Sequence, residues 1–389
     1  MALALSNTDY CLLAGMLLVF AYQVYFYCRY MGGVIRWKRQ RCDVGSDLEQ
    51  GEELPPVSII VCARNEEANL QDYLCTLLSQ DYPKFEVIVI NDGSEDRTQE
   101  VLERYALLFK NLYVTFVPRE TRGIGTKKLA LTIGAKAAHY EYLLLTDADC
   151  RPESPFWVRE MVRGFAPYAE EQTEIVLGYG AYFEQDTLLS SLICYDTLFS
   201  GMQYLGMAMA GHPYMGVGRN LAYKRATFFR HHGFRGLLTE PAGDDDLFVN
   251  KIATHDNTHV VCSPESITWS VPKKTWSEWL HQKRRHLSVS PNYKTDSKLR
   301  LVIEPMSRAL FYGLLVASFV CGSGITCCVA YGLWLLRVVM QWVVVNIGSH
   351  RLGGCFYGIE IVLYDLFLPL LTLYIFATRP LHKHRMWYW

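Results

Sequence analysis

The sequence predicts an α/β domain with a mostly parallel central sheet, flanked at both ends of the chain by transmembrane helices. Between residues 57 and 147, apolar runs alternate four times with helix-like segments, as in parallel sheets with helical crossovers. The last of these runs ends in two carboxylates, Asp147 and Asp149. Long apolar stretches near residues 11–27 and 309–377 are of membrane-spanning length.

Polar side chains follow the predicted strands where each strand ends. The strands are expected at 57–63, 86–91, 113–117, 142–147 and 175–183. Helices are expected at 66–78, from after Arg97 to about 109, at 126–139 and at 188–209. Asn65 is expected to cap the first of these helices. Since parallel strands end at one edge of a sheet, Asn65, Asp92 and Asp147 should meet there.

The pair Asp147 and Asp149 predicts a divalent metal site. In extended backbone, residues two apart point the same way, so the two carboxylates would repel one another unless a cation joined them. Oxygen ligands of this kind suit Mn2+ or Mg2+, which bind through one or two carboxylates and the phosphates of a substrate. A solvated Asp-rich turn is the alternative.

Composition and motifs exclude several classes. With 38 Lys and Arg against 39 Asp and Glu, the net charge is −1, and the basic residues gather beside the apolar segments, so no nucleic-acid partner is expected. The twelve cysteines lack C-x-x-C spacing, which argues against a zinc module or disulfide scaffold and favours a reduced, cytoplasm-facing domain. The segment 123–128 completes neither a P-loop nor a dinucleotide motif.

The apolar ends predict a multi-pass protein of the cell (inner) membrane. Basic residues follow the segment 11–27, as expected for an anchor with a cytoplasmic exit; a signal peptide is the alternative, but no cleavage site follows. Three further segments are expected at 309–329, 331–347 and 356–377, before a basic tail at 379–385. If the tail and the central domain are both cytoplasmic, one of the three lies in the membrane interface. Three segments are few for a conduit unless partner membrane proteins contribute.

The expected division of the chain has four parts. They are an anchor with a basic and acidic linker (1–54), an α/β domain (55–272), an amphipathic helix with a linker (273–305) and the C-terminal transmembrane segments with the tail (306–389).

Four ordered motifs resemble the family 2 glycosyltransferases of the GT-A fold. They are Val57-Ser-Ile-Ile-Val-Cys-Ala-Arg-Asn-Glu-Glu67, Val89-Ile-Asn-Asp-Gly-Ser94, Thr146-Asp-Ala-Asp149 and Gly243-Asp-Asp-Asp-Leu247. The resemblance covers roughly residues 55–290. It implies a UDP-sugar donor, a glycan or lipid-linked acceptor, and a divalent metal held by Asp147 and Asp149.

The resemblance also implies nucleotide-binding residues. Ala63, Asn65 and Glu66 would contact uracil and ribose, and Asp92 would accept a hydrogen bond from the uracil ring. Lys128 would lie near the diphosphate, although a Lys pair on a helix is more often solvated.

Three consecutive aspartates precede a predicted helix and include the expected general base. An inverting transfer needs a carboxylate that takes the proton of the acceptor hydroxyl. The family pattern E-D-x-D-L places this base at Asp244. Gly243 replaces the usual acid, however, so Asp245 remains an alternative. Helix capping is the simpler interpretation of the same residues.

Residues 274–288 have the spacing of an amphipathic helix at a membrane surface. Gln282 and Arg285 resemble part of the Q-x-x-R-W motif of the membrane-bound polysaccharide synthases in this family, which implies processive synthesis. By resemblance they would cover the diphosphate leaving group, where a fixed cation stabilises developing charge. His286 stands where Trp is expected, which weakens the inference to processive synthesis.

Three functions follow as hypotheses. The first is a membrane-bound inverting glycosyltransferase that extends a glycan or a lipid-linked acceptor. The second is a single-addition transferase acting on polyprenyl phosphate or a lipid head group. The third is a non-catalytic membrane partner that binds a nucleotide sugar.

Overall fold

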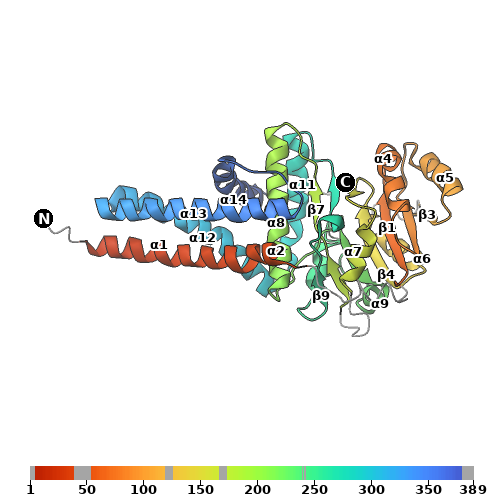
Figure 1. The fold of residues 1–389 in the computed structure, drawn as a ribbon, viewed down its shortest axis with the longest axis horizontal. Coiled ribbons are helices and arrows are strands. Elements are labelled where there is room, and N and C mark those ends of the chain that lie inside the picture. The colour runs from red at the N-terminus through yellow and green to blue at the C-terminus, as the bar shows by residue number, and fades with distance from the viewer. Residues whose placement is uncertain are drawn as a thin grey trace.

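The computed structural model describes residues 5–38, 54–118, 126–165, 173–238, 240 and 242–378. An α/β domain lies at one end, and long helices extend from it (Figure 1). The expected linker lies outside the described residues from 39 to 53, so only its basic start, up to Lys38, is described. The basic tail at 379–385 also lies outside the described residues.

The main sheet has seven strands in the order β3-β2-β1-β4-β8-β6-β9. Its first four strands are parallel, as predicted, whereas β8 runs antiparallel to both β4 and β6. The strands are β1 Val57–Ala63, β2 Phe85–Asn91, β3 Leu112–Phe116, β4 Tyr142–Asp147, β6 Ile175–Leu177, β8 Leu221–Lys224 and β9 Thr258–Val260.

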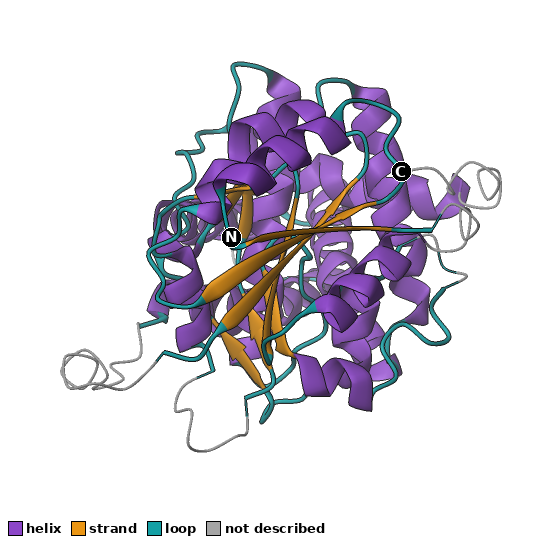
Figure 2. Ribbon diagram, turned by 90° about the vertical axis from the view of Figure 1, so that its right-hand side faces the viewer, coloured by secondary structure: helices purple, strands orange, loops and turns teal. Residues whose placement is uncertain are grey.

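Helices cover both faces of this sheet (Figure 2). Alternate residues of β1 enter different cores: Ile59 packs in a cluster with Leu74 and Trp157, whereas Ile60 packs in the cluster that contains Ala130. The helices of the domain are α4 Glu67–Leu78, α5 Thr98–Leu108, α6 Thr126–Ala137, α7 Trp157–Arg163, α8 Leu188–Met209, α9 Arg225–Arg230, α10 Asp246–Ile252 and α11 Trp276–Val289.

A second, three-stranded sheet has the order β5-β10-β7. Its strands are β5 Arg151–Pro152, β7 Gly180–Tyr182 and β10 Thr268–Ser270. The prediction of one strand over 175–183 is therefore wrong, because β6 and β7 belong to different sheets. The chain changes sheet at Gly178, where a Cβ atom would lie 2.6 Å from the Asn220 side chain.

Four helical segments are long and apolar enough to cross a membrane. They are the continuous segment formed by α1 Asn7–Phe26, the π-helix η1 Tyr27–Met31 and α2 Gly32–Arg36, together with α12 Thr295–Cys321, α13 Gly324–Arg351 and α14 Glu360–Thr378. The expected bounds 309–329 and 331–347 are wrong: the first helix begins earlier, and the two separate at Gly322, before the cap Ser323.

The long helices α1, α12 and α13 run side by side, whereas α14 crosses them at a steep angle (Figure 1). Helices α8 and α11 lie between this bundle and the main sheet (Figure 1). The first segment packs directly on α8, because a Cβ atom on Gly206 would lie 1.9 Å from the Tyr30 carbonyl oxygen. The bundle is thus joined closely to the α/β domain.

Candidate active site

The loops after β1 and β2 are tied together at the carboxyl edge of the sheet. Asn65 adopts a left-handed backbone conformation (φ 56°), and its side-chain oxygen accepts a hydrogen bond from Glu95 N at 2.8 Å. Its own N–H donates to Ser94 Oγ at 3.0 Å. Asn65 therefore does not cap α4, contrary to prediction; it fixes one loop against the other. Asp92, which is buried, donates its N–H to the Ala63 carbonyl at 2.8 Å.

Lys127 connects the carboxylates of two distant motifs. Its ammonium group lies 2.9 Å from Asp147 Oδ1 and 3.3 Å from Asp244 Oδ2. Burial alone would lower the pKa of Lys127, but Asp147, Asp244 and Asp245 outweigh it and raise the pKa well above its usual range. Residues separated widely in the sequence thus meet at one cation.

The charges around Cys62 show that these motifs surround the end of β1. Burial raises the pKa of the Cys62 thiol, Asp147, Asp244 and Asp92 raise it further, and Lys127 opposes them. The predicted edge therefore brings Asp92, Asp147 and Asp244 into one neighbourhood.

Asp149 lies in a turn rather than in the strand. Strand β4 ends at Asp147, and Cys150 donates its N–H to the Asp147 carbonyl at 3.1 Å. The prediction that extended backbone aligns Asp147 with Asp149 is therefore wrong. The two carboxylates are nevertheless close enough to interact: burial raises the pKa of Asp149, and the charge of Asp147 raises it further.

Glu66 belongs electrostatically to the same site. Burial raises its pKa to about 7, and the charges of Asp149 and Asp147 add to this rise. Its Oε2 accepts a hydrogen bond from Asn69 Nδ2 at 2.5 Å. The structure thus places Glu66 beside the paired aspartates.

Lys128 points away from the paired aspartates, to the backbone. Its ammonium group donates to the carbonyls of Glu240 and Ala242 at 2.8 and 2.7 Å, and it is 3% exposed. Lys128 therefore holds the loop that precedes Asp244. The cation that faces the carboxylates is its neighbour Lys127.

The three consecutive aspartates have different surroundings. Asp245 caps α10, because its Oδ1 accepts from Asp246 N and its Oδ2 from Gly218 N, both at 2.7 Å. Burial would raise the pKa of Asp244, but Lys127 and Lys128 hold it below its usual range. Asp244 is thus kept ionised, as a general base requires, whereas Asp245 serves the helix terminus.

Asp246 is buried, and both of its carboxylate oxygens have hydrogen-bond partners within the fold. Its Oδ2 lies 2.7 Å from the Tyr293 hydroxyl, and its Oδ1 accepts from Leu247 N at 2.7 Å. Burial, with the charge of Asp245, raises the pKa of Asp246 to about 8.

The substitution Asp246→Asn is expected to stabilise the protein increasingly as pH rises from 5 to 8. A folded-state pKa above the unfolded value stabilises the fold below the unfolded pKa, and this contribution is lost as pH rises towards the folded pKa. The neutral amide removes that loss. Melting temperatures of the parent, the variant and the control Asp256→Asn, at an exposed position, would be compared at both pH values. We expect Asp246→Asn to melt a few degrees higher than the parent at pH 8, and by a smaller margin at pH 5. A difference in melting temperature that does not change with pH would contradict the raised pKa of Asp246.

Helix α11 brings Gln282 and Arg285 towards this edge. Gln282 Nε2 donates to the Tyr182 hydroxyl of β7 at 3.2 Å. The charge of Arg285 contributes to the lowered pKa of Asp244, so its guanidinium group acts on the carboxylate of the expected base. The two residues therefore approach the site from the side of the second sheet.

Arg219 is a site residue that the sequence analysis did not single out. Its guanidinium group donates to the carbonyls of Gly180 and Ala181 at 2.8 and 2.9 Å and lies 4.2 Å from the centre of the Tyr182 ring. Its charge opposes the rise in the pKa of Asp149. The sequence around it, Gly216-Val-Gly-Arg-Asn220, is Gly-rich, which is the one local signal of a turn at this position.

The protein supplies only some of the ligands that a divalent cation would need at this site. Within the described residues, no three His, Cys, Asp or Glu side chains form a group that could hold a metal ion. Asp147 and Asp149 supply two carboxylates, and such a pair is completed in Mg2+ and Mn2+ sites by substrate phosphates and water. The donor set therefore suits a metal that arrives with a diphosphate.

Comparison with known proteins bears on this site. Residues 58–240 match the family model Glycosyl transferase family 2. The probable glycosyltransferase YdaM of Bacillus subtilis (strain 168) is 27% identical over 245 residues, which cover 61% of this chain and 56% of YdaM. The poly-beta-1,6-N-acetyl-D-glucosamine synthase of Staphylococcus epidermidis is 38% identical over 112 residues, 28% of this chain and 26% of the synthase. The matches thus span about half, or less, of these relatives.

Among solved structures, the mannosyltransferase PcManGT from Pyrobaculum calidifontis, in complex with GDP-Man and Mn2+, is similar with a TM-score of 0.55 at 20% identity. The match covers 89% of this chain and 98% of PcManGT. It supports the GT-A fold that the sequence motifs implied. Residues 58–240 of this chain are therefore similar to the family 2 glycosyltransferases, and the central domain has the GT-A fold.

Proposed function

We propose that the protein is a membrane-bound, metal-dependent inverting glycosyltransferase that transfers a sugar from a UDP-sugar to a glycan or lipid-linked acceptor. The observation that carries the proposal is the bridge of Lys127 between Asp147 and Asp244. It brings an expected metal ligand and the expected base to one ammonium group. The polysaccharide synthase among the relatives and the Mn2+ in PcManGT support the acceptor class and the metal.

The transfer would use Asp244 as the base. Its carboxylate takes the proton of the acceptor hydroxyl while the acceptor oxygen bonds to C1 of the sugar, and the bond from C1 to the diphosphate breaks. UDP leaves with that electron pair. Arg285, whose charge acts on Asp244, and Gln282 of the same helix would bind the leaving diphosphate. Mn2+ or Mg2+, held by Asp147 and Asp149, would neutralise part of its charge.

The uridine side of the site would be formed by the loops after β1 and β2. Ala63, Asn65 and Asp92 lie there together, and the bonds from Asn65 to the neighbouring loop keep the two loops in register. Glu66 would lie near the metal, because the charges of Asp149 and Asp147 contribute to its raised pKa.

The helical segments support a multi-pass arrangement in the cell (inner) membrane, with membrane lipid around them. The basic residues Arg29, Arg36 and Lys38 lie in the last turns of the first segment and just after it, where Arg29 donates to the Ala210 carbonyl and Trp37 to the Val260 carbonyl of β9. Basic residues at this end favour a cytoplasmic α/β domain. Helices α12 and α13 would carry the chain out and back, each longer than the hydrocarbon layer of about 30 Å. The steep crossing of α14 (Figure 1) favours α14 as the segment that lies in the interface.

A donor screen tests the proposal. Purified full-length protein is incubated with UDP-glucose, UDP-N-acetylglucosamine and GDP-mannose, with Mn2+, Mg2+ or a chelator, and release of the nucleoside diphosphate is measured. We expect at least one UDP-sugar to be turned over with metal and turnover to stop with the chelator. Turnover that is unaffected by chelation, or occurs only with GDP-mannose, would contradict the metal or the donor assignment.

A further inference from the structure

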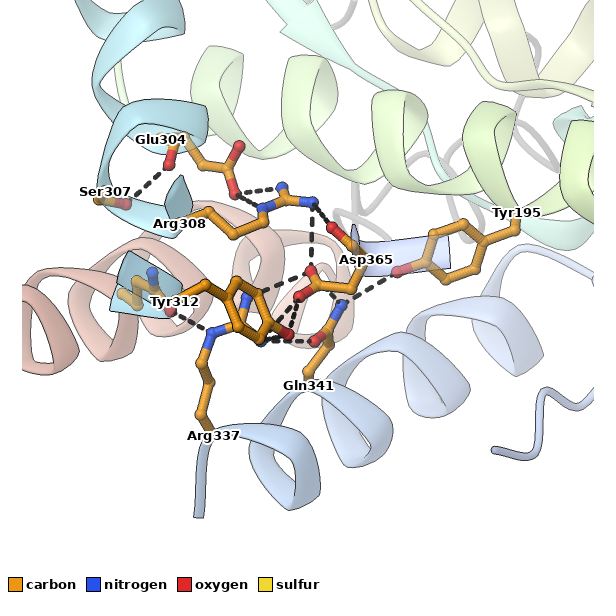
Figure 3. A network of polar contacts seen from close by, with 9 residues as sticks. Tyr195, Glu304, Ser307, Arg308, Tyr312, Arg337, Gln341 and Asp365 are labelled. Atoms are coloured by element: carbon orange, nitrogen blue, oxygen red, sulfur yellow. Dashed lines mark hydrogen bonds and ion pairs between the residues drawn. The ribbon is translucent and has the colours of Figure 1, made fainter. Parts of the chain in front are cut away.

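Buried charged side chains join the apolar helices to one another (Figure 3). The charged members are two acids and two arginines, so the cluster is neutral. It comprises Glu304, Arg308 and Tyr312 of α12, Arg337 and Gln341 of α13, Asp365 of α14 and Tyr195 of α8.

Asp365 is the centre of this cluster. It is fully buried, and it forms ion pairs with Arg308 at 3.1 Å and Arg337 at 2.8 Å. Its oxygens also accept hydrogen bonds from the Tyr312 hydroxyl at 2.8 Å and from Gln341 Nε2 at 2.9 Å. One side chain of α14 thus attaches this helix to both α12 and α13.

Such a cluster is better suited to fixing geometry than to adding stability. Removing charges from water is costly, and apolar side chains of similar volume often hold helices together equally well. Ionisable residues within transmembrane segments are rare and commonly serve a function. The directional contacts of Asp365 leave α14 only one way to lie across its neighbours.

The cluster reaches α11 through two consecutive residues of α8. Tyr195 accepts a hydrogen bond from Gln341 Nε2 at 3.1 Å. The next residue, Asp196, accepts from Lys283 Nζ with both oxygens at 2.6 Å. Lys283 adjoins Gln282 in α11, so α8 contacts the cluster through Tyr195 and the active-site helix through Asp196.

A second connection to α11 runs through α14. The ring centres of Trp276 in α11 and Phe367 in α14 are 6.3 Å apart. The guanidinium group of Arg284 lies 6.0 Å from the centre of the Tyr374 ring. Both contacts depend on where Asp365 holds α14.

We propose that Asp365 is a positioning residue for sugar transfer: by fixing α14 against α12 and α13, it sets the position of α11 and thereby of Gln282 and Arg285. This inference rests on the proposed function. Asp365 acts from within the helix bundle and belongs to none of the strands and loops that carry Asp92, Asp147 and Asp149. Its loss should therefore impair the transfer step and spare donor binding.

The test uses full-length Asp365→Asn in lipid nanodiscs. We expect kcat to fall roughly 2- to 30-fold, the range of coupling through packed networks, with an unchanged donor KM. Hydrogen exchange of the α11 amides should become faster, while that of β1 and β4 stays as in the parent. The control is Asp9→Asn: Asp9 has a small exposed area and accepts from Ser323 N at 2.7 Å and Thr326 Oγ1 at 2.6 Å at the far end of the bundle. It should alter neither kcat nor α11 exchange.

A variant that neutralises the whole cluster guards against misfolding of the single variant. No unpaired charge is left in the cluster when four substitutions are combined: Glu304→Gln, Arg308→Met, Arg337→Met and Asp365→Asn. We again expect a lower kcat with an unchanged donor KM. Parental kcat and α11 exchange in either folded variant would overturn the inference. If the parent turns over no nucleotide sugar, the proposed function fails, whereas the exchange comparison still tests the positioning of α11.

Discussion

Asp244→Asn is expected to lower kcat for sugar transfer about 10²- to 10⁴-fold, the usual contribution of general acid–base catalysis. The amide cannot accept the proton of the acceptor hydroxyl. Lys127 and Lys128 keep the carboxylate of Asp244 ionised in the parent by lowering its pKa, so the base form is present at neutral pH. Donor affinity should change little, because the loops after β1 and β2 are untouched.

The experiment compares Asp244→Asn with Asp245→Asn in the same preparation. Asp245 accepts backbone hydrogen bonds with both carboxylate oxygens, and asparagine keeps only one acceptor oxygen, so Asp245→Asn should cost roughly 1 kcal/mol of stability and less kcat than Asp244→Asn. The donor dissociation constant and kcat are measured for both. If Asp244→Asn transfers sugar at the parental rate while Asp245→Asn does not, the base is Asp245.

Asp149→Ala is expected to lower metal-dependent release of the nucleoside diphosphate about 10²- to 10³-fold, as loss of one electrostatic group at a reacting centre typically does. Within the described residues only Asp147 would then remain as a carboxylate ligand at the end of β4. The burial that raises the pKa of Asp149 is offset, when a divalent cation is bound, by that cation's charge.

Release is measured over a titration of Mn2+, with Asp72→Ala, at an exposed position of α4, as the control. The Asp149 variant should need more Mn2+ and reach a lower maximum, whereas the control should follow the parent. An Asp149→Ala curve that overlays the parental curve would remove Asp149 from the metal site.

The sheet and its ligand edge were predictable because local patterns determine them. Alternation of apolar runs and helices gives parallel strands, and parallel strands end at one edge, so Asp92 and Asp147 had to come close together. Asp244 follows a stretch without regular alternation of strands and helices, and nothing local indicates where it lies. Its place near Asp147 came only from the resemblance, and the structure supplies the contact through Lys127.

Other features depend on contacts that the sequence does not reveal. Lys127 and Lys128 are adjacent in a helix and point about 100° apart, so sequence cannot say which one faces the carboxylates. The role of Arg219 depends on carbonyls of β7, which lie far away in the chain.

The start of α12 was missed for a related reason. Its first turns carry charges that lower the hydropathy, and two of them, Glu304 and Arg308, are buried against each other and Asp365. The partner residue that makes this burial acceptable lies in a different helix, which a sliding average of hydropathy does not see.

Binding of Mn2+ measured by electron paramagnetic resonance, with and without UDP, tests most directly whether the aspartate pair and a diphosphate share one ion. We expect the parent to retain about one Mn2+ when UDP is present and much less without it, and Asp149→Ala to retain little in either case. Equal Mn2+ retention by the parent and Asp149→Ala, or no effect of UDP on the parent, would contradict this expectation.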